Sequence, residues 1–161
     1  MIVILIGVSG VGKTMIGQLL AEDLGWQFYE GDDFHPQANI DKMSQGIPLT
    51  DADRAPWLAA LNRLIRDLVR EGRSAVVACS ALKQAYRDRL LRDTQDGCVI
   101  YLKGDYDLIR KRLQERPGHF MKASLLASQF DALEEPERVL AVDTAQEPET
   151  IVSLIKRELS L

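Results

Sequence analysis

The sequence predicts an α/β domain of three layers, in which helices cover both faces of a five-stranded parallel sheet. Short apolar runs of strand length alternate along the chain with segments whose apolar residues recur at helical spacing. The first apolar run is followed at once by a glycine-rich turn and a helix, as in a parallel βα unit. The chain has 161 residues, which is enough for one such domain and cramped for two.

The N-terminal part is expected to form a strand, a helix and a second strand. The apolar run 2–6 leads through the turn into a helix that starts at Lys13 and ends before Gly25. Glycine is favoured there because the residue after a helix often has a left-handed backbone. The strand 27–30 ends at a polar run that carries Asp32 and Asp33. Since the carboxyl ends of parallel strands border the ligand crevice, we expect these carboxylates beside it.

The middle of the chain combines an irregular segment with two regular elements. Residues 39–57 show little periodicity and contain one glycine and two prolines, so we predict a binding segment laid over the sheet edge. From residue 57 to 69 the apolar positions form an amphipathic helix that Gly72 closes. The continuous apolar run 75–79 is typical of a central parallel strand.

The C-terminal part continues the alternation. It is expected to form a strand at 98–102, a helix at about 106–114, a basic loop and helix within 115–133, a strand at 139–142 and a closing helix at about 148–159. No repeat, linker or low-complexity segment interrupts the pattern. We therefore expect a single domain that spans residues 1–161.

Composition narrows the possible partners. The formal net charge is -4, which argues against a general affinity for nucleic acid or an anionic membrane, because such proteins usually carry a basic surplus. Cys79 and Cys98 lie in apolar runs, so we expect buried reduced thiols and neither a disulfide framework nor a metal site. The N-terminal apolar run has no basic lead and is too short to span a membrane. We therefore expect a cytoplasmic protein.

The turn after the first strand has the pattern Gly-x-x-x-x-Gly-Lys-Thr, which is typical of a P-loop. Between a strand and a helix, its backbone N–H groups can surround a phosphate without interference from side chains. Lys13 would add a positive charge, and the Thr14 hydroxyl would bind a Mg²⁺ that bridges the outer phosphates. A dinucleotide-binding turn would need Gly-x-Gly-x-x-Gly, whereas the glycines here fall at positions 7, 10 and 12. The predicted phosphate-binding residues are Gly7, Val8, Ser9, Gly10, Val11, Gly12, Lys13 and Thr14.

Several further motifs give the chain a resemblance to a known family over nearly its whole length. They are Gly31-Asp32-x-x-His35-Pro36, Asn39-x-x-Lys42-Met43-x-x-Gly46-x-Pro48-Leu49-x-Asp51-x-Asp53-Arg54-x-Pro56-Trp57-Leu58, Cys79-Ser80-Ala81-Leu82-Lys83-x-x-Tyr86-Arg87-x-x-Leu90, Tyr101-Leu102, and Arg116-x-x-His119-Phe120-Met121 followed by Ser128-Gln129. Together with the P-loop they resemble the gluconokinases, short P-loop kinases related to shikimate and nucleoside monophosphate kinases. The segments 53–58 and 79–83 are the distinctive ones.

The resemblance implies an activity, cofactors and an assembly. The expected fold is that of the P-loop NTP hydrolases, with a mobile helical lid at about 115–128. The expected reaction transfers the γ-phosphate of ATP to the 6-hydroxyl of D-gluconate, with Mg²⁺ as cofactor, in a homodimer. Two alternatives stay open: a related kinase for shikimate or another small hydroxylated acid, and a nucleotide-driven switch. Against the switch, the sequence has neither an Asn-Lys-x-Asp nor an Asp-x-x-Gly run.

Phosphoryl transfer needs donor and acceptor held in line and the charge on the moving group offset. We expect Lys13 to stabilise the phosphates and Asp32 to orient and partly deprotonate the acceptor hydroxyl. Asp32 could instead cap a helix or bind magnesium through water. The resemblance adds Arg116, which a closing lid would bring onto the transferring group. Asp143 ends an apolar run, as a metal-binding carboxylate would. The resemblance implies that this strand edge lies near the adenine, so a capping role suits Asp143 better.

The acceptor is expected to meet a set of basic and polar side chains. A carboxylate needs a fixed cation, and Arg54, Lys83 and Arg87 could supply it. For any single one an ordinary surface charge is the alternative, and Arg87 could pair with Asp88 or Asp93 on its helix. The resemblance also implies the substrate-binding residues His35, Lys42, Ser80, His119 and Gln129, together with Asp32. Arg112 would stack on the adenine or remain a solvated helix charge.

Overall fold

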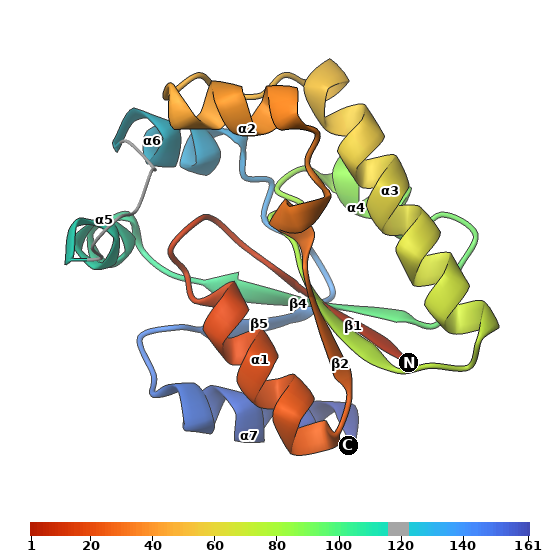
Figure 1. The fold of residues 1–161 in the computed structure, drawn as a ribbon. Coiled ribbons are helices and arrows are strands. Elements are labelled where there is room, and N and C mark those ends of the chain that lie inside the picture. The colour runs from red at the N-terminus through yellow and green to blue at the C-terminus, as the bar shows by residue number, and fades with distance from the viewer. Residues whose placement is uncertain (116–122) are drawn as a thin grey trace.

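The computed structural model describes residues 1–115 and 123–161, and its centre is a five-stranded parallel sheet (Figure 1). The strand order is β2-β3-β1-β4-β5. The strands are β1 (Ile2–Ile6), β2 (Gln27–Glu30), β3 (Ala75–Ala78), β4 (Gly97–Lys103) and β5 (Leu140–Asp143). The predicted three-layer fold with a five-stranded parallel sheet is confirmed.

Helices cover both faces of this sheet (Figure 1). The described helices are α1 (Lys13–Leu24), α2 (Gln37–Ser44), α3 (Asp51–Arg70), α4 (Gln84–Leu90), α5 (Tyr106–Glu115), α6 (Ala123–Ala132) and α7 (Pro148–Leu159), with a 3₁₀ turn, η1 (Gly31–Phe34), after β2. Helices α1 and α7 pack against one face, and α3 and α4 against the other. In the described residues no helix is long and apolar enough to cross a membrane.

Two apolar cores result from the alternation of side chains along β1. Val3 and Leu5 point into the core formed with α1 and α7, whereas Ile2, Ile4 and Ile6 point into the core formed with α3 and α4. All five side chains are fully buried, as expected for the central strand of a parallel sheet. The strand is therefore a rigid base for the turn that follows it.

The irregular segment predicted at 39–57 is wrong in part. It contains most of α2 and the first turns of α3, which begins at Asp51 and not at residue 57. A capping box starts α3, since the Thr50 side chain accepts a hydrogen bond from the Asp53 N–H while the Asp53 carboxylate accepts one from the Thr50 N–H. Pro56 lies inside the helix, where it removes one backbone donor without ending the helix.

Two smaller expectations also change. Helix α4 (Gln84–Leu90) follows β3 closely and carries Arg87, but no bounds were predicted for this helix. Cys79 is buried as expected and burial raises the pKa of its thiol to about 12, but Cys98 is only half-buried. Both cysteines are free thiols.

Candidate active site at the carboxyl edge of the sheet

The turn between β1 and α1 has a backbone that only glycine fits well. Gly7 has a φ of +147°, and a Cβ atom there would lie 2.6 Å from the Leu102 carbonyl oxygen. Gly12 has a φ of +105° and is the N-cap of α1. The first N–H groups of α1 have no partner within the helix, so this turn offers a site for an anion.

The Lys13 side chain folds back over the turn. Its ammonium donates to the carbonyl oxygens of Gly7 at 3.0 Å and Val8 at 2.9 Å. Burial lowers the pKa of Lys13, and the nearby carboxylates of Asp32 and Glu30 oppose that shift. The amine thus lies at the mouth of the phosphate-binding turn with two acidic side chains close to it.

Glu30 is a site residue that sequence reasoning missed. The Thr14 hydroxyl donates to Glu30 Oε2 at 2.5 Å. Burial raises the pKa of Glu30, and the Thr14 hydrogen bond partly counters it. A signal was available, because Glu30 is the last residue of β2 and therefore lies at the carboxyl edge of the sheet. The carboxylates that the sequence predicts beside the crevice are Asp32 and Asp33, in the polar run that follows.

A hydroxyl and a carboxylate are the oxygen donors that Mg²⁺ prefers, so Thr14 and Glu30 fit this ion. Among the described residues no group of three His, Cys, Asp or Glu side chains could hold a metal by itself. A magnesium ion here would therefore take its other ligands from phosphate and water, as Mg²⁺ commonly does in nucleotide sites.

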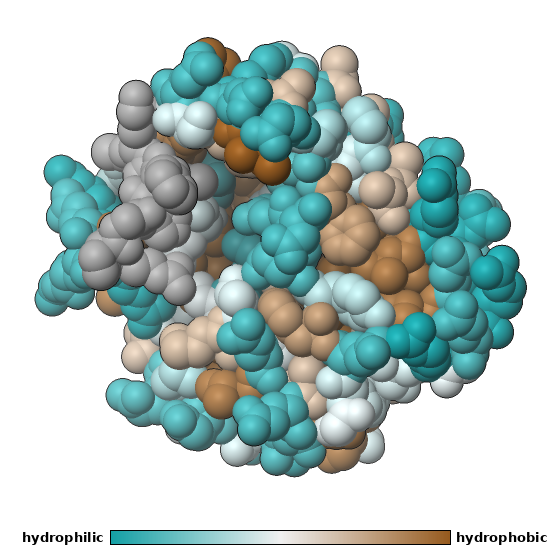
Figure 2. Space-filling view, in the orientation of Figure 1, coloured by the Kyte–Doolittle hydropathy of each residue, from teal (hydrophilic) through white to brown (hydrophobic). Residues whose placement is uncertain are grey.

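A cavity of about 910 Å³ opens above the P-loop. Figure 2 shows the surface hollowed left of centre, below α2. Asp32 and Glu30 line it on the sheet side, and apolar Ile40 and Met43 of α2 line it from above. The other side is formed by Arg112 and the segment 144–148. Its size is that of a small-molecule site.

Arg112 is held against the wall of this cavity. Its Nη2 donates to the Thr144 carbonyl oxygen at 2.6 Å. Asp143, which ends β5, accepts a hydrogen bond from the Ala145 N–H at 2.9 Å and so caps the turn beside Arg112. The capping role is therefore the one the geometry supports.

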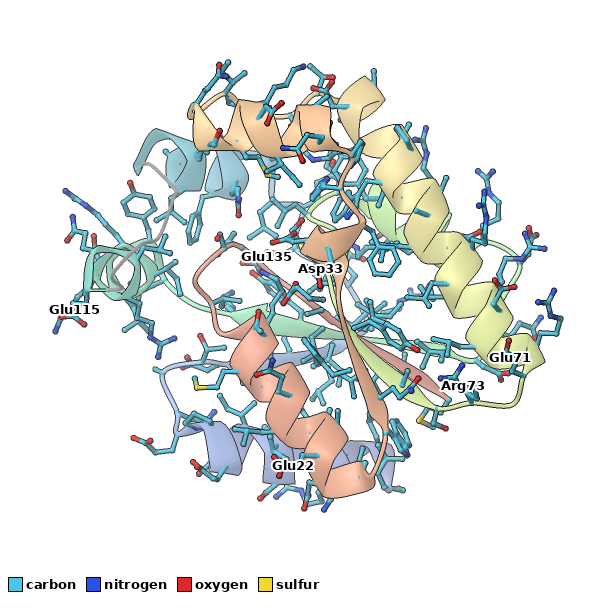
Figure 3. The ribbon with its side chains drawn as sticks, viewed as in Figure 1. Glu22, Asp33, Glu71, Arg73, Glu115 and Glu135 are labelled. Carbon is cyan, nitrogen blue, oxygen red and sulfur yellow. The ribbon has the colours of Figure 1, made fainter. Side chains whose placement is uncertain are left out.

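Asp32 and His35 lie on one short turn, next to Asp33 (Figure 3). His35 Nε2 is 3.8 Å from Asp32 Oδ1, and the His35 ring stacks on Trp57 at 4.2 Å between centroids. Asn39 Nδ2 lies 3.2 Å from His35 Nδ1 and donates to the Asp53 carbonyl at 2.9 Å. An amide nitrogen only donates, so Nδ1 accepts and Nε2 carries the proton towards Asp32.

The ring of His35 is neutral at neutral pH. Burial lowers the pKa of His35, the charge of Arg54 lowers it further, and Asp32 opposes both effects. Trp57 is itself buried and donates from Nε1 to the Gly31 carbonyl at 2.7 Å. Trp57 is thus a core residue that also fixes the turn carrying Asp32.

Two of the predicted cations, Arg54 on α3 and Lys83 before α4, lie close to the ring of Tyr86. The Lys83 ammonium donates to Asp51 Oδ1 at 3.1 Å, and the Tyr86 hydroxyl donates to the same oxygen. The Arg54 guanidinium lies 5.5 Å and the Lys83 ammonium 5.6 Å from the centroid of the Tyr86 ring. The Lys83 and Tyr86 hydrogen bonds lower the pKa of Asp51, so this carboxylate is ionised.

Lys42 has a carboxylate partner of its own. Its ammonium donates to both oxygens of Asp53, at 3.0 Å and 2.8 Å. These hydrogen bonds, with that of the Thr50 N–H, lower the pKa of Asp53 to about 2. Lys42 therefore links α2 to the start of α3, near His35 and Asn39.

Arg87 is directed into the protein. It is buried, its Nη1 donates to the carbonyls of Ala81 and Leu82 at 3.0 Å, and its Nη2 donates to the Glu134 carbonyl at 3.0 Å. Ala81 has a φ of +37°, which is strained for an alanine. Contrary to the expected contact with substrate, the Arg87 donors hold the strained turn between Ser80 and Lys83.

Two other predicted residues, Gln129 and Ser80, accept hydrogen bonds from backbone N–H groups of the P-loop. The Ser9 N–H donates to Gln129 Oε1 at 2.7 Å, so α6 contacts the phosphate-binding turn. The Ser80 carbonyl accepts a hydrogen bond from the Gly7 N–H at 3.3 Å. Arg116 and His119 lie outside the described residues.

A phosphate-binding turn between the first strand and first helix of this sheet defines a P-loop nucleotide-binding domain. Residues 2–136 match a family described as an AAA domain. A protein of Xenopus tropicalis named probable gluconokinase is 44% identical, over 99% of this chain and 93% of its own length. The thermosensitive gluconokinase of Escherichia coli (strain K12) is 51% identical, over 83% of this chain and 72% of its own length.

Solved structures agree with the sequence relatives. The unliganded structure of a sugar kinase from Janibacter sp. HTCC2649 has a TM-score of 0.93 at 41% identity, covering 99% of this chain and 94% of that one. The chain belongs to the gluconokinase family. The predicted resemblance is thereby confirmed, and with it the class of nucleotide-binding kinases.

Proposed function

We propose that this protein transfers the γ-phosphate of ATP to the 6-hydroxyl of D-gluconate, giving 6-phospho-D-gluconate and ADP. The observation that carries the proposal is the position of Asp32 between two groups of residues. Asp32 lines the cavity together with Lys13 of the P-loop, and its Oδ1 lies 3.8 Å from Nε2 of His35, whose pKa the charge of Arg54 lowers. An acceptor beside Asp32 would thus meet phosphate on one side and cations on the other. Family membership supports the choice of gluconate.

On the phosphate side, Lys13 would exchange its two carbonyl partners for phosphate oxygens and offset the charge of the transferring group. Asp32 would accept a hydrogen bond from the attacking hydroxyl and take up its proton. Mg²⁺, held by Thr14 with Glu30 beside it, would supply charge neutralisation between the outer phosphates. The adenine would lie towards Arg112.

On the acceptor side, Arg54 and Lys83 would bind the gluconate carboxylate. Lys83 is paired with Asp51 and stacked on Tyr86, so the incoming carboxylate would replace Asp51 as its partner. His35, Lys42, Ser80 and Gln129 would provide hydrogen bonds to the hydroxyl groups. Arg87 would contribute by holding the turn that presents Ser80 and Lys83.

The remaining expectations belong to the same proposal. Residues 115–128 would act as a lid that brings Arg116 and His119 over the phosphates. The protein would act in the cytoplasm as a homodimer, without a nucleic-acid or membrane partner. The acidic net charge supports the last point.

The test is ADP release from ATP and Mg²⁺ with a panel of acceptors: gluconate, shikimate, glucose, AMP and none. Strong stimulation by gluconate alone is the expected result. Stimulation by shikimate would favour the related-kinase alternative. Release that no acceptor stimulates would contradict the kinase proposal and favour a nucleotide switch.

A further inference from the structure

A second cavity, of about 750 Å³, lies along α3 and shares no lining residue with the cavity above the P-loop. One wall is the outer face of α3 and the other is the end of α4 with the turn after it. Figure 3 labels Glu71 and Arg73 just beyond the C-terminal end of α3, away from Asp33 at the centre of the molecule. The cavity is therefore separate from the proposed reaction.

Its lining has an unusual charge for this protein. Five arginines and two aspartates line it, a local excess of three positive charges on a chain whose net charge is -4. The arginines are Arg63, Arg66, Arg70, Arg89 and Arg92. Side chains with nitrogen tips follow the outer side of α3 at the right of Figure 3. Such a concentration of like charge favours a bound anion.

Only part of this charge is used within the protein. Arg70 Nη2 lies 2.9 Å from Asp67 Oδ1, and Arg66 Nη1 lies 4.0 Å from Asp93 Oδ2. In residues 1–115 and 123–161, no hydrogen bond or ion pair engages the side chains of the other three arginines, which are Arg63, Arg89 and Arg92. Their guanidinium donors are available to a ligand.

The two walls are held at a fixed separation. The Asn62 side chain on α3 donates to the carbonyls of Leu90 and Arg92, both at 2.9 Å. The turn itself is closed by a hydrogen bond from the Thr94 N–H to the Leu91 carbonyl at 3.2 Å. The cavity is thus a built feature, because a side chain of one wall binds the backbone of the other.

Thr94 carries a polar atom that the described part of the chain leaves unpaired. It lines the cavity, and its hydroxyl oxygen is buried without a hydrogen-bond partner in the described part of the chain. Buried hydroxyls are nearly always hydrogen-bonded, since leaving one unpaired is unfavourable. The hydroxyl is closed to solvent in this rotamer, and rotation about χ1 would turn it into the cavity, where a ligand oxygen would remove this deficit.

We propose that this cavity is a second ligand site, for an organic monophosphate such as a sugar phosphate. Guanidinium groups bind phosphate through paired hydrogen bonds, and Arg63, Arg89 and Arg92 line the cavity with donors free for such bonds. Ala59 and Val69 add apolar wall for the organic part. The volume lies within the range of about 300–1,000 Å³ that small-molecule sites occupy.

The experiment is calorimetric titration of the intact protein with glucose 6-phosphate, after saturation with ADP, Mg²⁺ and gluconate to fill the sites of the proposed reaction. Glucose titrated in the same way shows whether the phosphate is needed. We expect one equivalent of glucose 6-phosphate to bind, more weakly at higher salt because the attraction is electrostatic. No binding, or equal binding of glucose, would overturn the proposal.

Variants locate the bound phosphate. The double variant Arg63→Ser/Arg89→Ser is expected to lose at least about tenfold in affinity, since charge-assisted hydrogen bonds are lost. Arg157→Ser, which removes an exposed arginine of α7, should bind as the wild type does. Unchanged affinity in the double variant, or an equal loss in the control, would show that the phosphate binds elsewhere.

Thr94→Val tests the unpartnered hydroxyl. Valine has nearly the same shape and lacks the oxygen, so the melting temperature of the free protein should stay the same or rise. The affinity for glucose 6-phosphate should fall. A lower melting temperature with unchanged affinity would show that the hydroxyl serves the fold, and it would contradict its part in the site.

Discussion

The two sides of the candidate active site differ in how their cations are held. On the nucleotide side, Lys13 donates to two neutral carbonyl oxygens of its own turn. On the acceptor side, Lys42 and Lys83 each have a carboxylate partner, Asp53 and Asp51. In the proposed function, a phosphate would therefore bind Lys13 without separating an ion pair, whereas a substrate carboxylate would compete with Asp51 for Lys83.

The difference suggests how binding energy is divided between the substrates. The P-loop is preorganised by its glycines and by β1, so nucleotide binding needs little rearrangement. When the acceptor site is empty, Lys42 and Lys83 are paired with carboxylates while Arg54 donates to the Leu49 carbonyl, which limits the number of unpaired like charges at the start of α3. Selectivity for an acidic acceptor then depends on exchanging one carboxylate for another.

The largest expected effect is on the nucleotide side. Lys13→Ala should lower kcat by about a hundredfold or more, because the charge on the transferring phosphate is no longer offset. ADP release in the presence of gluconate measures it. Arg157→Ala, on the exposed face of α7, is the control and should be near wild type. Near-normal turnover of Lys13→Ala would remove the P-loop lysine from the mechanism.

The next effect tests the acceptor side. Arg54→Ala should raise the KM for gluconate by about tenfold or more, from loss of a charge-assisted hydrogen bond, and should change the KM for ATP little. Initial rates with each substrate varied in turn give both constants. Arg157→Ala controls for the loss of one positive charge. An effect confined to ATP would contradict the proposed contact with the carboxylate.

A smaller effect tests the exchange of carboxylates directly. In Asp51→Asn, Lys83 keeps a neutral acceptor but loses its ionic partner, so the substrate carboxylate has less to displace. The KM for gluconate should fall by about two- to fivefold, in line with the small net worth of an exposed ion pair. Steady-state kinetics at low salt measures it. A rise in KM would mean that Asp51 holds Lys83 in position for the substrate and does not compete with it.

The same comparison separates what the sequence could predict from what it could not. The P-loop and the closing helix α7 were predicted with their bounds because their signals are local, a glycine pattern and a helical period. The helix α3 begins at Asp51, after the Thr50 capping box, but its start was predicted at residue 57. The first turn is polar and Pro56 follows it, so these residues show no helical period of apolar side chains. Glu30 was missed although it ends β2, because its role depends on a hydrogen bond from Thr14 on α1.

Arg87 shows most clearly what a sequence pattern cannot predict. Arg87 has the residue type and spacing of a substrate ligand, and its helix faces the site. Its partners include the Glu134 carbonyl, 47 residues away in the chain. Such a contact arises only from the packed fold, so no pattern near Arg87 distinguishes a structural guanidinium from a substrate-binding one.

The smallest expected effect concerns pH and the Lys42–Asp53 pair. The pKa of Asp53 is lowered from 3.8 to about 2 in the folded protein, so the folded state favours the ionised carboxylate. The resulting stabilisation is present above the unfolded pKa and is lost as the pH falls through the folded one. Asp53→Asn should therefore lower the melting temperature above pH 4, and the gap to wild type should close as the pH approaches 2. Thermal melts across this range measure the gap. A gap independent of pH would mean that Asp53 acts through the shape of the α3 cap and that its charge is immaterial.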